Sequence, residues 1–295
     1  AVILNQVAND FGGVLSLVTT GAATIMDATA LSLDGSVGTT LDVTAGGLVG
    51  FGATTVTGAV TVATTGGIAQ SGAVVFNSTA DLSVGATITL QNAANQFAGV
   101  VTLNAGGDAS LVTVDAVSVE GQLDNGLSIH ANDAVDLGDL RVEDDLVIVA
   151  HGDITQSDAD AALYIGGQTT LTANDGTTDY NITLANRASE TDSVNDFVGN
   201  LLITSAADVD VRAIETLRVG VTSSTDADIY ADYKIFLTGA TVTGTLNAVG
   251  NFDMTGDISA QFIDLYSDSF LNMNGHSITA TATGSEGYVR VVAEG

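Results

Sequence analysis

Proline, cysteine and tryptophan are all absent from this sequence of 295 residues. At an average usage near 5%, a chain of this length would carry about 15 prolines. Proline removes a backbone N–H donor, so its absence favours a fold in which nearly every N–H is needed in a β ladder. The absence of cysteine is typical of a bacterial exoprotein that stays unfolded during export.

Basic residues are scarce as well. Six Lys and Arg stand against 35 Asp and Glu, which gives a formal net charge of −29, and the first basic residue is Arg141. Nucleic acid is excluded as a partner because phosphate binding needs a cationic surface. Membrane insertion is not expected, since no apolar run approaches the ~20 residues of a membrane span. Solvated Asp residues at turns explain most of this charge.

Apolar residues are nevertheless plentiful, at 45% of the chain, while aromatic residues make up only 5%. The core must therefore consist mainly of Val, Leu, Ile and Ala. Short apolar–polar–apolar stretches, such as 31–33, 41–43 and 60–62, have the two-residue period of a half-buried strand. Clusters of Gly, Asn and Asp between them are typical of turns. No stretch has the period and length of a helix, so the sequence predicts an all-β fold.

Stretches of the chain recur at a fixed offset. Residues 2–17 resemble residues 88–103, and GGIAQSGA from Gly66 resembles GDITQSDA from Gly152, both with an offset of 86 residues. A third copy follows from residue 182, lengthened by extra residues. Such periodicity is the signature of a repeat protein whose units bury their apolar faces against their neighbours.

Turn residues indicate the length of each coil. Asp108, Asp133 and Asp153 each precede a strand-like stretch, at intervals of roughly 20–25 residues. Four coils of about 21.5 residues would fill the 86-residue repeat. A coil of roughly 20–25 residues has room for three short strands and three turns. The sequence therefore predicts a parallel β-helix (β-solenoid) of about 14 coils.

The whole chain, 1–295, is expected to be a single β-solenoid. Its superrepeats are predicted at approximately 1–87, 88–181 and 182–295, with a loop insertion near 174–195. Both ends read as strands without a polar cap, so we expect the ladders to continue end to end, into flanking repeats or into other copies of the chain.

An Asn-x-Phe-x-Gly element occurs once in each superrepeat. In this element we expect Phe to fill a corner of the core, Gly to permit a turn and Asn to bond to the adjacent backbone. Its residues are Asn9, Phe11 and Gly13; Asn95, Phe97 and Gly99; and Asn195, Phe197 and Gly199.

This element, followed by alternating Val and Leu and set among turns of the Gly-Asp-Ile-Thr type, resembles the repeat regions of filamentous-haemagglutinin-like exoproteins and autotransporter passengers. The resemblance covers essentially the whole chain. It implies a right-handed parallel β-helix that projects other modules from a bacterial surface or adheres directly. It also implies an extracellular or cell-surface location, and it carries over no catalytic or binding residues.

An enzyme is the first alternative, because β-helices also include polysaccharide lyases and hydrolases. The basic residues are scattered, and the available acid pairs, such as Asp226 with Asp228 or those within 143–145, are expected by chance among 35 acids. Tryptophan, the usual platform for sugars, is missing. We therefore expect no enzymatic activity.

Calcium is the one cofactor that the sequence suggests. Asp108, Asp133 and Asp153 could form an oxygen-rich row along one edge of consecutive coils. The simpler interpretation is that Asp favours turns and needs no metal. The three histidines lack metal-site spacing. Outward Thr residues could form an ice-binding array, but Thr is also an ordinary strand residue.

These patterns favour a structural, non-enzymatic segment of a long extracellular fibre or adhesin stalk. The expected partners are copies of the chain or flanking repeats, stacked end to end. The main alternative is an adhesin domain whose side face, or the loop at 174–195, binds surface carbohydrate.

Overall fold

Alternating side chains define the strands of this protein. In the stretch Leu41–Ala45 the first, third and fifth residues are buried, and the two between them are exposed. This two-residue period places one face of each strand in the interior. The computed structural model describes residues 1–186, 194–267, 269, 271–282 and 287–293. These residues contain strands and turns without any helix, and therefore no helix that could cross a membrane.

The chain divides into two compact units. The first comprises Ala1–Val135 with Arg141–Glu143, and the second comprises Asp136–Leu140 with Asp144–Gly295. Strand β17 (Val135–Val142) contributes residues to both units.

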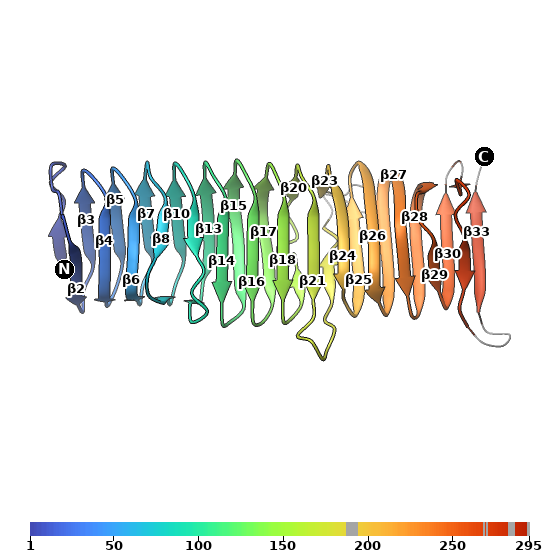
Figure 1. Cartoon of the computed structure of the whole chain (residues 1–295), viewed down its shortest axis with the longest axis horizontal. Coiled ribbons are helices and arrows are strands. Elements are labelled where there is room, and N and C mark those ends of the chain that lie inside the picture. Colours follow the sequence, from blue (N-terminus) through green and yellow to red (C-terminus); the bar gives the residue numbers. More distant parts are fainter. Residues whose placement is uncertain (187–193, 268, 270, 283–286, 294–295) are drawn as a thin grey trace. The chain divides into compact units, whose positions relative to one another are not determined.

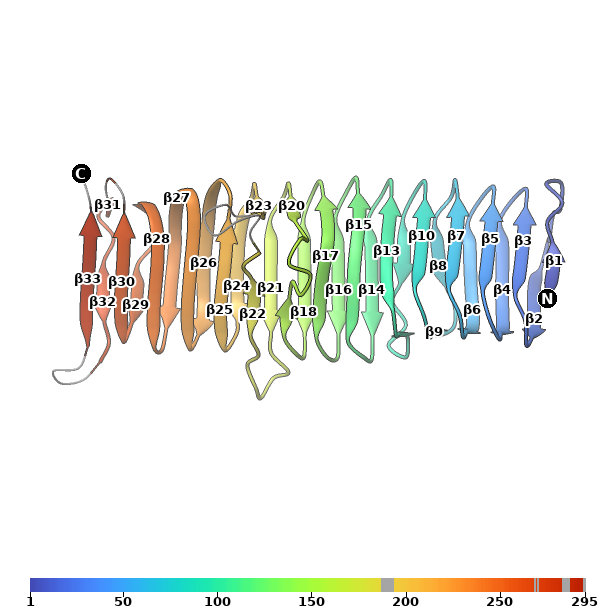
Figure 2. The ribbon, with the colours of Figure 1, turned by 180° about the vertical axis from the view of Figure 1, so that it is seen from behind.

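The first unit consists of two parallel ladders, whose strands run in opposite directions in Figures 1 and 2. One ladder contains β1 (Val2–Leu4), β3 (Ala23–Asp27), β5 (Leu41–Ala45), β7 (Val60–Thr64), β10 (Ala80–Val84), β13 (Val100–Ala105) and β15 (Val117–Leu123). The other contains β2 (Val14–Thr19), β4 (Leu31–Val37), β6 (Val49–Val56), β8 (Ile68–Gln70), β9 (Val74–Phe76), β11 (Ile88–Leu90), β12 (Gln96–Phe97), β14 (Ala109–Thr113) and β16 (Leu127–Ala131).

The second unit is built in the same way. One ladder contains β18 (Leu146–Ala150), β21 (Thr169–Ala173), β24 (Asn200–Ser205), β26 (Thr216–Ser224), β29 (Ile258–Ala260), β31 (Leu271–Asn272) and β32 (Ile278–Ala280). The other contains β19 (Ile154–Thr155), β20 (Leu163–Ile165), β22 (Ile182–Leu184), β23 (Asp196–Phe197), β25 (Asp208–Ala213), β30 (Phe262–Ser267) and β33 (Tyr288–Ala293). The long strands β27 (Asp226–Val242) and β28 (Thr245–Met254) run through both ladders.

The predicted all-β solenoid is confirmed, with about 14 turns of stacked parallel strands. Two of the three predicted strands of a coil often run together as one longer segment. Strand β6, for example, pairs with β8 through its first residues and with β9 through its last. Ala23 pairs with Leu41, and Leu41 with Val60, so a coil takes up about 20 residues here.

Equivalent strands of the first two superrepeats lie in different ladders. Strand β2 begins at Val14 and its equivalent β13 at Val100, yet β2 pairs with β4 in one ladder and β13 with β10 in the other. An offset of one superrepeat therefore moves a strand from one ladder to the other. The superrepeat ends half a coil away from a whole number of coils, so it does not contain the four whole coils expected. Asp108 precedes a strand of one ladder, and Asp133 precedes a strand of the other. The longer interval between these two turn residues is therefore not the length of one coil.

The interior of each unit is apolar along its length. In the first unit Phe51, Phe76 and Phe97 stack edge to face in successive coils, with ring centroids 5.8 Å apart in both pairs. Edge-to-face packing adds stabilisation beyond the burial of area alone. The core is therefore continuous from one coil to the next.

Candidate functional site

A pair of side-chain amides, one buried and one half-buried, joins two coils in the first unit. Asn95 is fully buried, and its Nδ2 donates to Gln70 Oε1 (2.9 Å) and to the carbonyl oxygens of Leu90 and Val112 (both 3.1 Å). Its Oδ1 accepts from Gln70 Nε2 (2.8 Å) and from the N–H of Val74 (2.9 Å). The Asn and Gln amides thus satisfy each other and the backbone around them, an arrangement that we call the amide clamp.

The second unit contains the same clamp. Asn195 Nδ2 donates to Gln156 Oε1 (2.9 Å) and to Leu184 O (3.1 Å), while its Oδ1 accepts from Gln156 Nε2 (2.9 Å) and from the N–H of Leu163 (3.1 Å). Both amide side chains are buried. A buried polar network of this kind is stabilising only when every member is satisfied.

The remaining asparagine of the element, Asn9, makes fewer hydrogen bonds. It is half-buried, and its Nδ2 donates to Leu4 O (2.9 Å) and Met26 O (3.2 Å). The expected bond from Asn to the adjacent backbone is thus present in all three copies. Sequence reasoning missed the glutamines, although Gln70 and Gln156 occupy the same place in the two recurring segments GGIAQSGA and GDITQSDA.

The Phe and Gly residues of the element are less uniform. Phe97 and Phe197 are buried, whereas Phe11 is partly exposed. An added Cβ at Gly99 would lie 2.6 Å from a backbone carbon of Ser78, and at Gly199 it would meet backbone at 2.1 Å. Neither glycine has a positive φ. These two glycines therefore permit the close approach of neighbouring coils, and they do so without a positive φ.

At Gly13, in the first copy, an added Cβ would meet no heavy atom within 4 Å. The same element therefore contains two tightly packed glycines and one in open space.

Many of the acidic residues cap the backbone of a neighbouring coil. Asp145 Oδ1 accepts from the N–H of Gln168 (2.7 Å), and Asp257 Oδ1 accepts from the N–H of Ser277 (2.8 Å). Asp226 makes the equivalent bond to Thr245. A carboxylate at the turn thus bonds an N–H group of the following coil. This gives part of the acidic charge a structural purpose.

Two of the three calcium candidates, Asp108 and Asp153, bond to the following coil, and the third, Asp133, bonds to its own next residue. Asp108 accepts from the N–H of Gly126 (3.1 Å), Asp153 from that of Asn181 (2.8 Å), and Asp133 from its neighbour Ala134 (2.8 Å). Asp108 precedes β14, and the next coil places Gly126 beside it, so Asp133 does not follow Asp108 in one row. Among the described residues no three His, Asp or Glu side chains converge as metal ligands would. Calcium binding therefore stays a prediction.

One buried carboxylate has an altered acidity. Asp27 is only 4% exposed and accepts hydrogen bonds from the N–H groups of Phe11 (2.9 Å) and Thr29 (2.7 Å) and from the Thr29 hydroxyl (3.0 Å). Burial alone would raise the pKa of Asp27, but these hydrogen bonds favour the ionised form and lower the pKa below its usual value. The charged carboxylate thus fastens the Phe11 turn to the neighbouring coil.

Several of the residues weighed for an enzyme take part in structural contacts. Arg141 pairs with Glu143 (2.5 Å), and the Oδ1 atoms of Asp145 and Asp226 accept from backbone N–H groups. Asp228 occupies an outward ladder position between Asp210 and Asn247. The expected lack of enzymatic activity therefore stays a prediction.

The loop predicted near 174–195 is described in part. Residues 174–181 leave the coil between β21 and β22, and Asn174 and Asp179 form an antiparallel bridge within them. The Thr177 hydroxyl and the N–H groups of Thr177 and Thr178 bond to Asp175, which lowers its pKa. Residues 187–193 of the predicted insertion lie outside the described residues.

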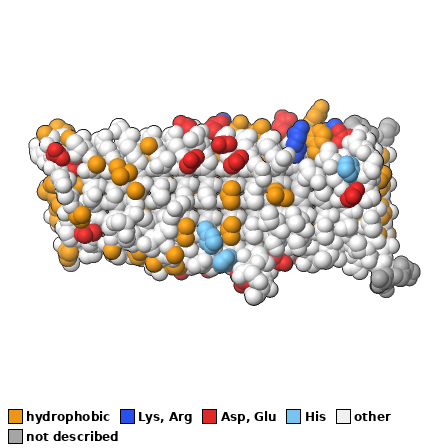
Figure 3. All heavy atoms as spheres, viewed as in Figure 1, with side chains coloured by type: hydrophobic (Ala, Val, Ile, Leu, Met, Phe, Trp, Pro, Cys, Tyr) orange, Lys and Arg blue, Asp and Glu red, His pale blue; other side chains and the backbone are white. Residues whose placement is uncertain are grey.

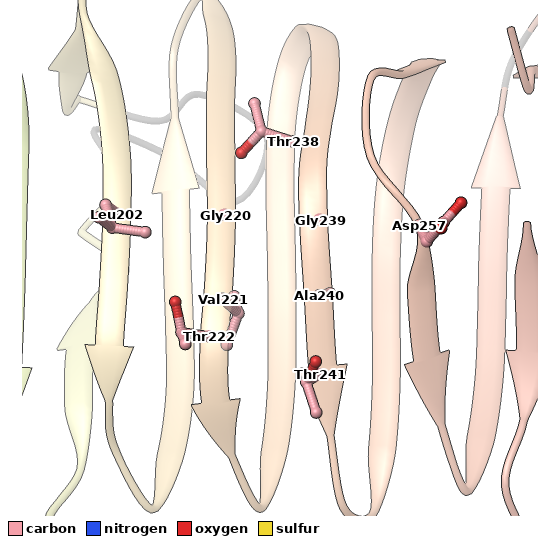
Figure 4. Close-up of a pocket in the computed structure, with 9 residues that line it drawn as sticks. All are labelled: Leu202, Gly220, Val221, Thr222, Thr238, Gly239, Ala240, Thr241 and Asp257. Carbon is pink, nitrogen blue, oxygen red and sulfur yellow. The ribbon is translucent and has the colours of Figure 1, made fainter. Parts of the chain in front are cut away.

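A surface groove of about 270 Å³ lies in the second unit (Figure 4). Its floor contains Gly220 of β26 and Gly239 of β27, which are ladder partners. Leu202 and Asp257 form its two ends along the coils, and Thr222, Thr238 and Thr241 line it with hydroxyl groups. We call this the Gly220 groove.

A second groove, of about 280 Å³, lies in the first unit and is lined mainly by Ser32, Asp34, Gly50 and Gln70. Both grooves form where the ladder register shifts and where glycine occupies an outward position. Each groove contains one carboxylate, Asp34 or Asp257; the first-unit groove adds the side-chain amide of Gln70, and the Gly220 groove adds three threonine hydroxyls.

Positive charge is concentrated beside aromatic rings in the second unit. The Arg218 guanidinium lies 4.5 Å from the centroid of the Phe236 ring, and Lys234 Nζ lies 4.7 Å from the same centroid. Arg212 lies over Tyr230 at 5.1 Å. On the face seen in Figure 3, Lys and Arg side chains are few and gather near one edge, close to hydrophobic side chains.

Comparison with known proteins identifies a family of repeats. Residues 46–104 and 124–204 match the model of a family described as repeats of unknown function (DUF5649). Each matched segment contains one amide clamp, Asn95 with Gln70 in the first and Asn195 with Gln156 in the second. No curated protein and no solved structure matches the chain. Over these two segments the chain is similar to a repeat family, in agreement with a repetitive β-solenoid.

Proposed function

We propose that this chain is a structural, non-enzymatic segment of a long extracellular fibre or adhesin stalk. The observation that carries the proposal is the in-register stacking of coils over an apolar interior. Leu41, for example, pairs with Ala23 on one side and Val60 on the other. Such a stack resists deformation because each backbone row is bonded to the next. The resemblance of the repeats to filamentous-haemagglutinin-like exoproteins supports a place at the bacterial surface.

Stacking can continue beyond the ladders of each unit. Val2 donates its N–H to Ala22 O, so the N–H of Ile3, the next residue of β1, points away from β3. Ile3, Val14 and Val18 are 66, 64 and 84% exposed. A strand edge with free donors and apolar side chains is a template for further pairing. We therefore propose that β1 accepts a coil of another copy or of a flanking repeat.

Electron microscopy and sedimentation of the purified chain test this proposal. We expect end-to-end filaments, or a sedimentation coefficient that rises with protein concentration. Ile3→Pro removes the outward donor without removing an internal hydrogen bond, so it should abolish this association, whereas Ile3→Ala should retain it. Association of the Pro variant equal to that of the unmodified chain would show that β1 is not the contact.

The non-enzymatic part of the proposal has its own test. Incubation with a panel of acidic and neutral glycans should leave their chain lengths unchanged. Depolymerisation of any of them, lost on substitution of a carboxylate in this chain, would replace the structural role by a catalytic one.

A further inference from the structure

The Gly220 groove is a consequence of ladder register. Gly220 pairs with Leu202 on one side and with Gly239 on the other, so two consecutive coils have no side chain at this outward position. The register shifts after Val219, which leaves Thr238 as an extra residue in β27. The Thr238 hydroxyl oxygen lies 2.6 Å from the place where a Cβ on Gly220 would be. The result is a flat floor next to a hydroxyl group.

The polar groups of the groove are available to a ligand. Thr222, Thr238 and Thr241 are exposed, and within the described part of the chain their hydroxyls have no protein hydrogen-bond partner. Asp257 closes one end, oriented by the N–H of Ser277 (2.8 Å). Leu202 supplies an apolar wall at the other end (Figure 4). Hydroxyl donors and acceptors around a flat floor suit a polyhydroxylated ring.

A cation lies on the same strand as the groove floor, although it is not one of the residues that line the groove. Arg218 is two residues before Gly220 on β26, about 7 Å away along the strand and on the same face. Its guanidinium is held against the Phe236 ring, and among the residues that the structure describes no carboxylate forms an ion pair with it. On a surface with 35 acidic residues, an exposed arginine without such a partner is unexpected. Arginine binds carboxylates strongly through two parallel N–H groups.

We propose that the Gly220 groove binds one uronic acid residue of an acidic polysaccharide. The sugar ring lies over Gly220 and Gly239, its hydroxyls bond to the threonines, and its carboxylate pairs with Arg218. The groove volume of about 270 Å³ is near the lower end for small-molecule sites, so it fits a single sugar unit rather than an extended segment. This binding goes beyond the structural role and does not depend on it.

Calorimetry on the full chain in about 150 mM salt tests the assignment, with polygalacturonate as the probe. This salt concentration screens repulsion from the net negative charge beyond about 8 Å. Methyl-esterified polygalacturonate, which keeps the ring and loses the charge, should bind at least about tenfold more weakly. Polyglutamate, which keeps the charge and lacks the ring, should also bind at least about tenfold more weakly.

Variants locate the site. Arg218→Gln should weaken polygalacturonate binding about tenfold or more, and Thr222→Val should weaken it severalfold without a change of charge. Arg290→Gln and Thr89→Val, at exposed positions outside the groove, are the matched controls and should bind as the unmodified chain does. No binding of polygalacturonate, equal binding of the ester or of polyglutamate, or unchanged binding by Arg218→Gln would each overturn the proposal.

Discussion

The side-chain amides of Asn95 and Gln70 bond to each other twice, at 2.8 and 2.9 Å, across 25 residues of sequence. Asn95 also bonds three backbone groups in the surrounding coils, those of Val74, Leu90 and Val112. One side chain thus connects several segments of the first unit. Because Asn95 is fully buried, no water is available to replace these partners.

Replacing Asn95 with Ala should destabilise the first unit locally. The substitution removes the partner of the buried N–H of Val74, and a buried unsatisfied group costs about 1–3 kcal/mol. Gln70 is half-buried and keeps its bonds to Gly72 and Asn92. We expect the free energy of local opening at the Val74 amide to fall by about 3 kcal/mol, measured by native-state hydrogen exchange.

Asn9→Ala is the control for this substitution. Asn9 is half-buried and makes two side-chain bonds, so its loss should cost about 1 kcal/mol or less. Equal effects of the two substitutions would show that the amide clamp adds nothing to the ordinary asparagine contact.

The glycines of the repeated element should respond differently to the same change. Gly99→Ala brings a Cβ within 2.6 Å of Ser78 backbone, so the two coils must move apart, at a cost of about 2 kcal/mol or more. Gly13→Ala meets nothing within 4 Å and should be neutral or slightly stabilising. Urea denaturation of both variants measures the difference, and similar midpoints would contradict the close approach at Gly99.

The sequence was sufficient to predict the solenoid, because two-residue alternation and the 86-residue offset both depend on local chemistry. It was not sufficient to assign the strands to ladders. A turn residue such as Asp108 or Asp133 marks the start of a strand, but it does not say to which ladder that strand belongs. From the sequence alone, the interval between these two residues is therefore indistinguishable from one coil.

The groove and the clamp depend on alignments that no local pattern contains. Gly220 aligns with Gly239 only because the register shifts after Val219. Gln70 looks like an ordinary turn residue until the stacking of coils brings it to Asn95. The recurrence of Gln at the same place in two segments was the available signal, but its meaning required the register.

The aromatic stack in the first unit predicts a large effect of truncation. Phe76 is fully buried between Phe51 and Phe97, so Phe76→Ala should remove both ring contacts and leave a cavity. Substitutions of this type cost about 3–5 kcal/mol. Tyr233→Ala, at a ring that is 64% exposed, should cost less than about 1 kcal/mol. Calorimetric melting of the two variants should separate them clearly, and equal transition temperatures would contradict the stack.

Asp27 predicts an acid-sensitive contribution to the stability of the first unit. Hydrogen bonds from Phe11 and Thr29 lower the pKa of Asp27 in the folded protein, so ionised Asp27 stabilises the fold at pH values above the ordinary carboxyl pKa. This stabilisation is lost as the pH falls through the lowered pKa, when the carboxylate takes up a proton. Relief of charge repulsion within a chain of net charge −29 acts in the opposite sense on acidification. The difference in unfolding free energy between the unmodified chain and Asp27→Asn isolates the Asp27 contribution, because the remaining acids are common to both.

We expect this difference to be constant from pH 7 to about pH 5 and to shrink below about pH 4. A difference that stays constant to pH 2, or that grows in acid, would show that the hydrogen bonds to Asp27 do not favour its charged form.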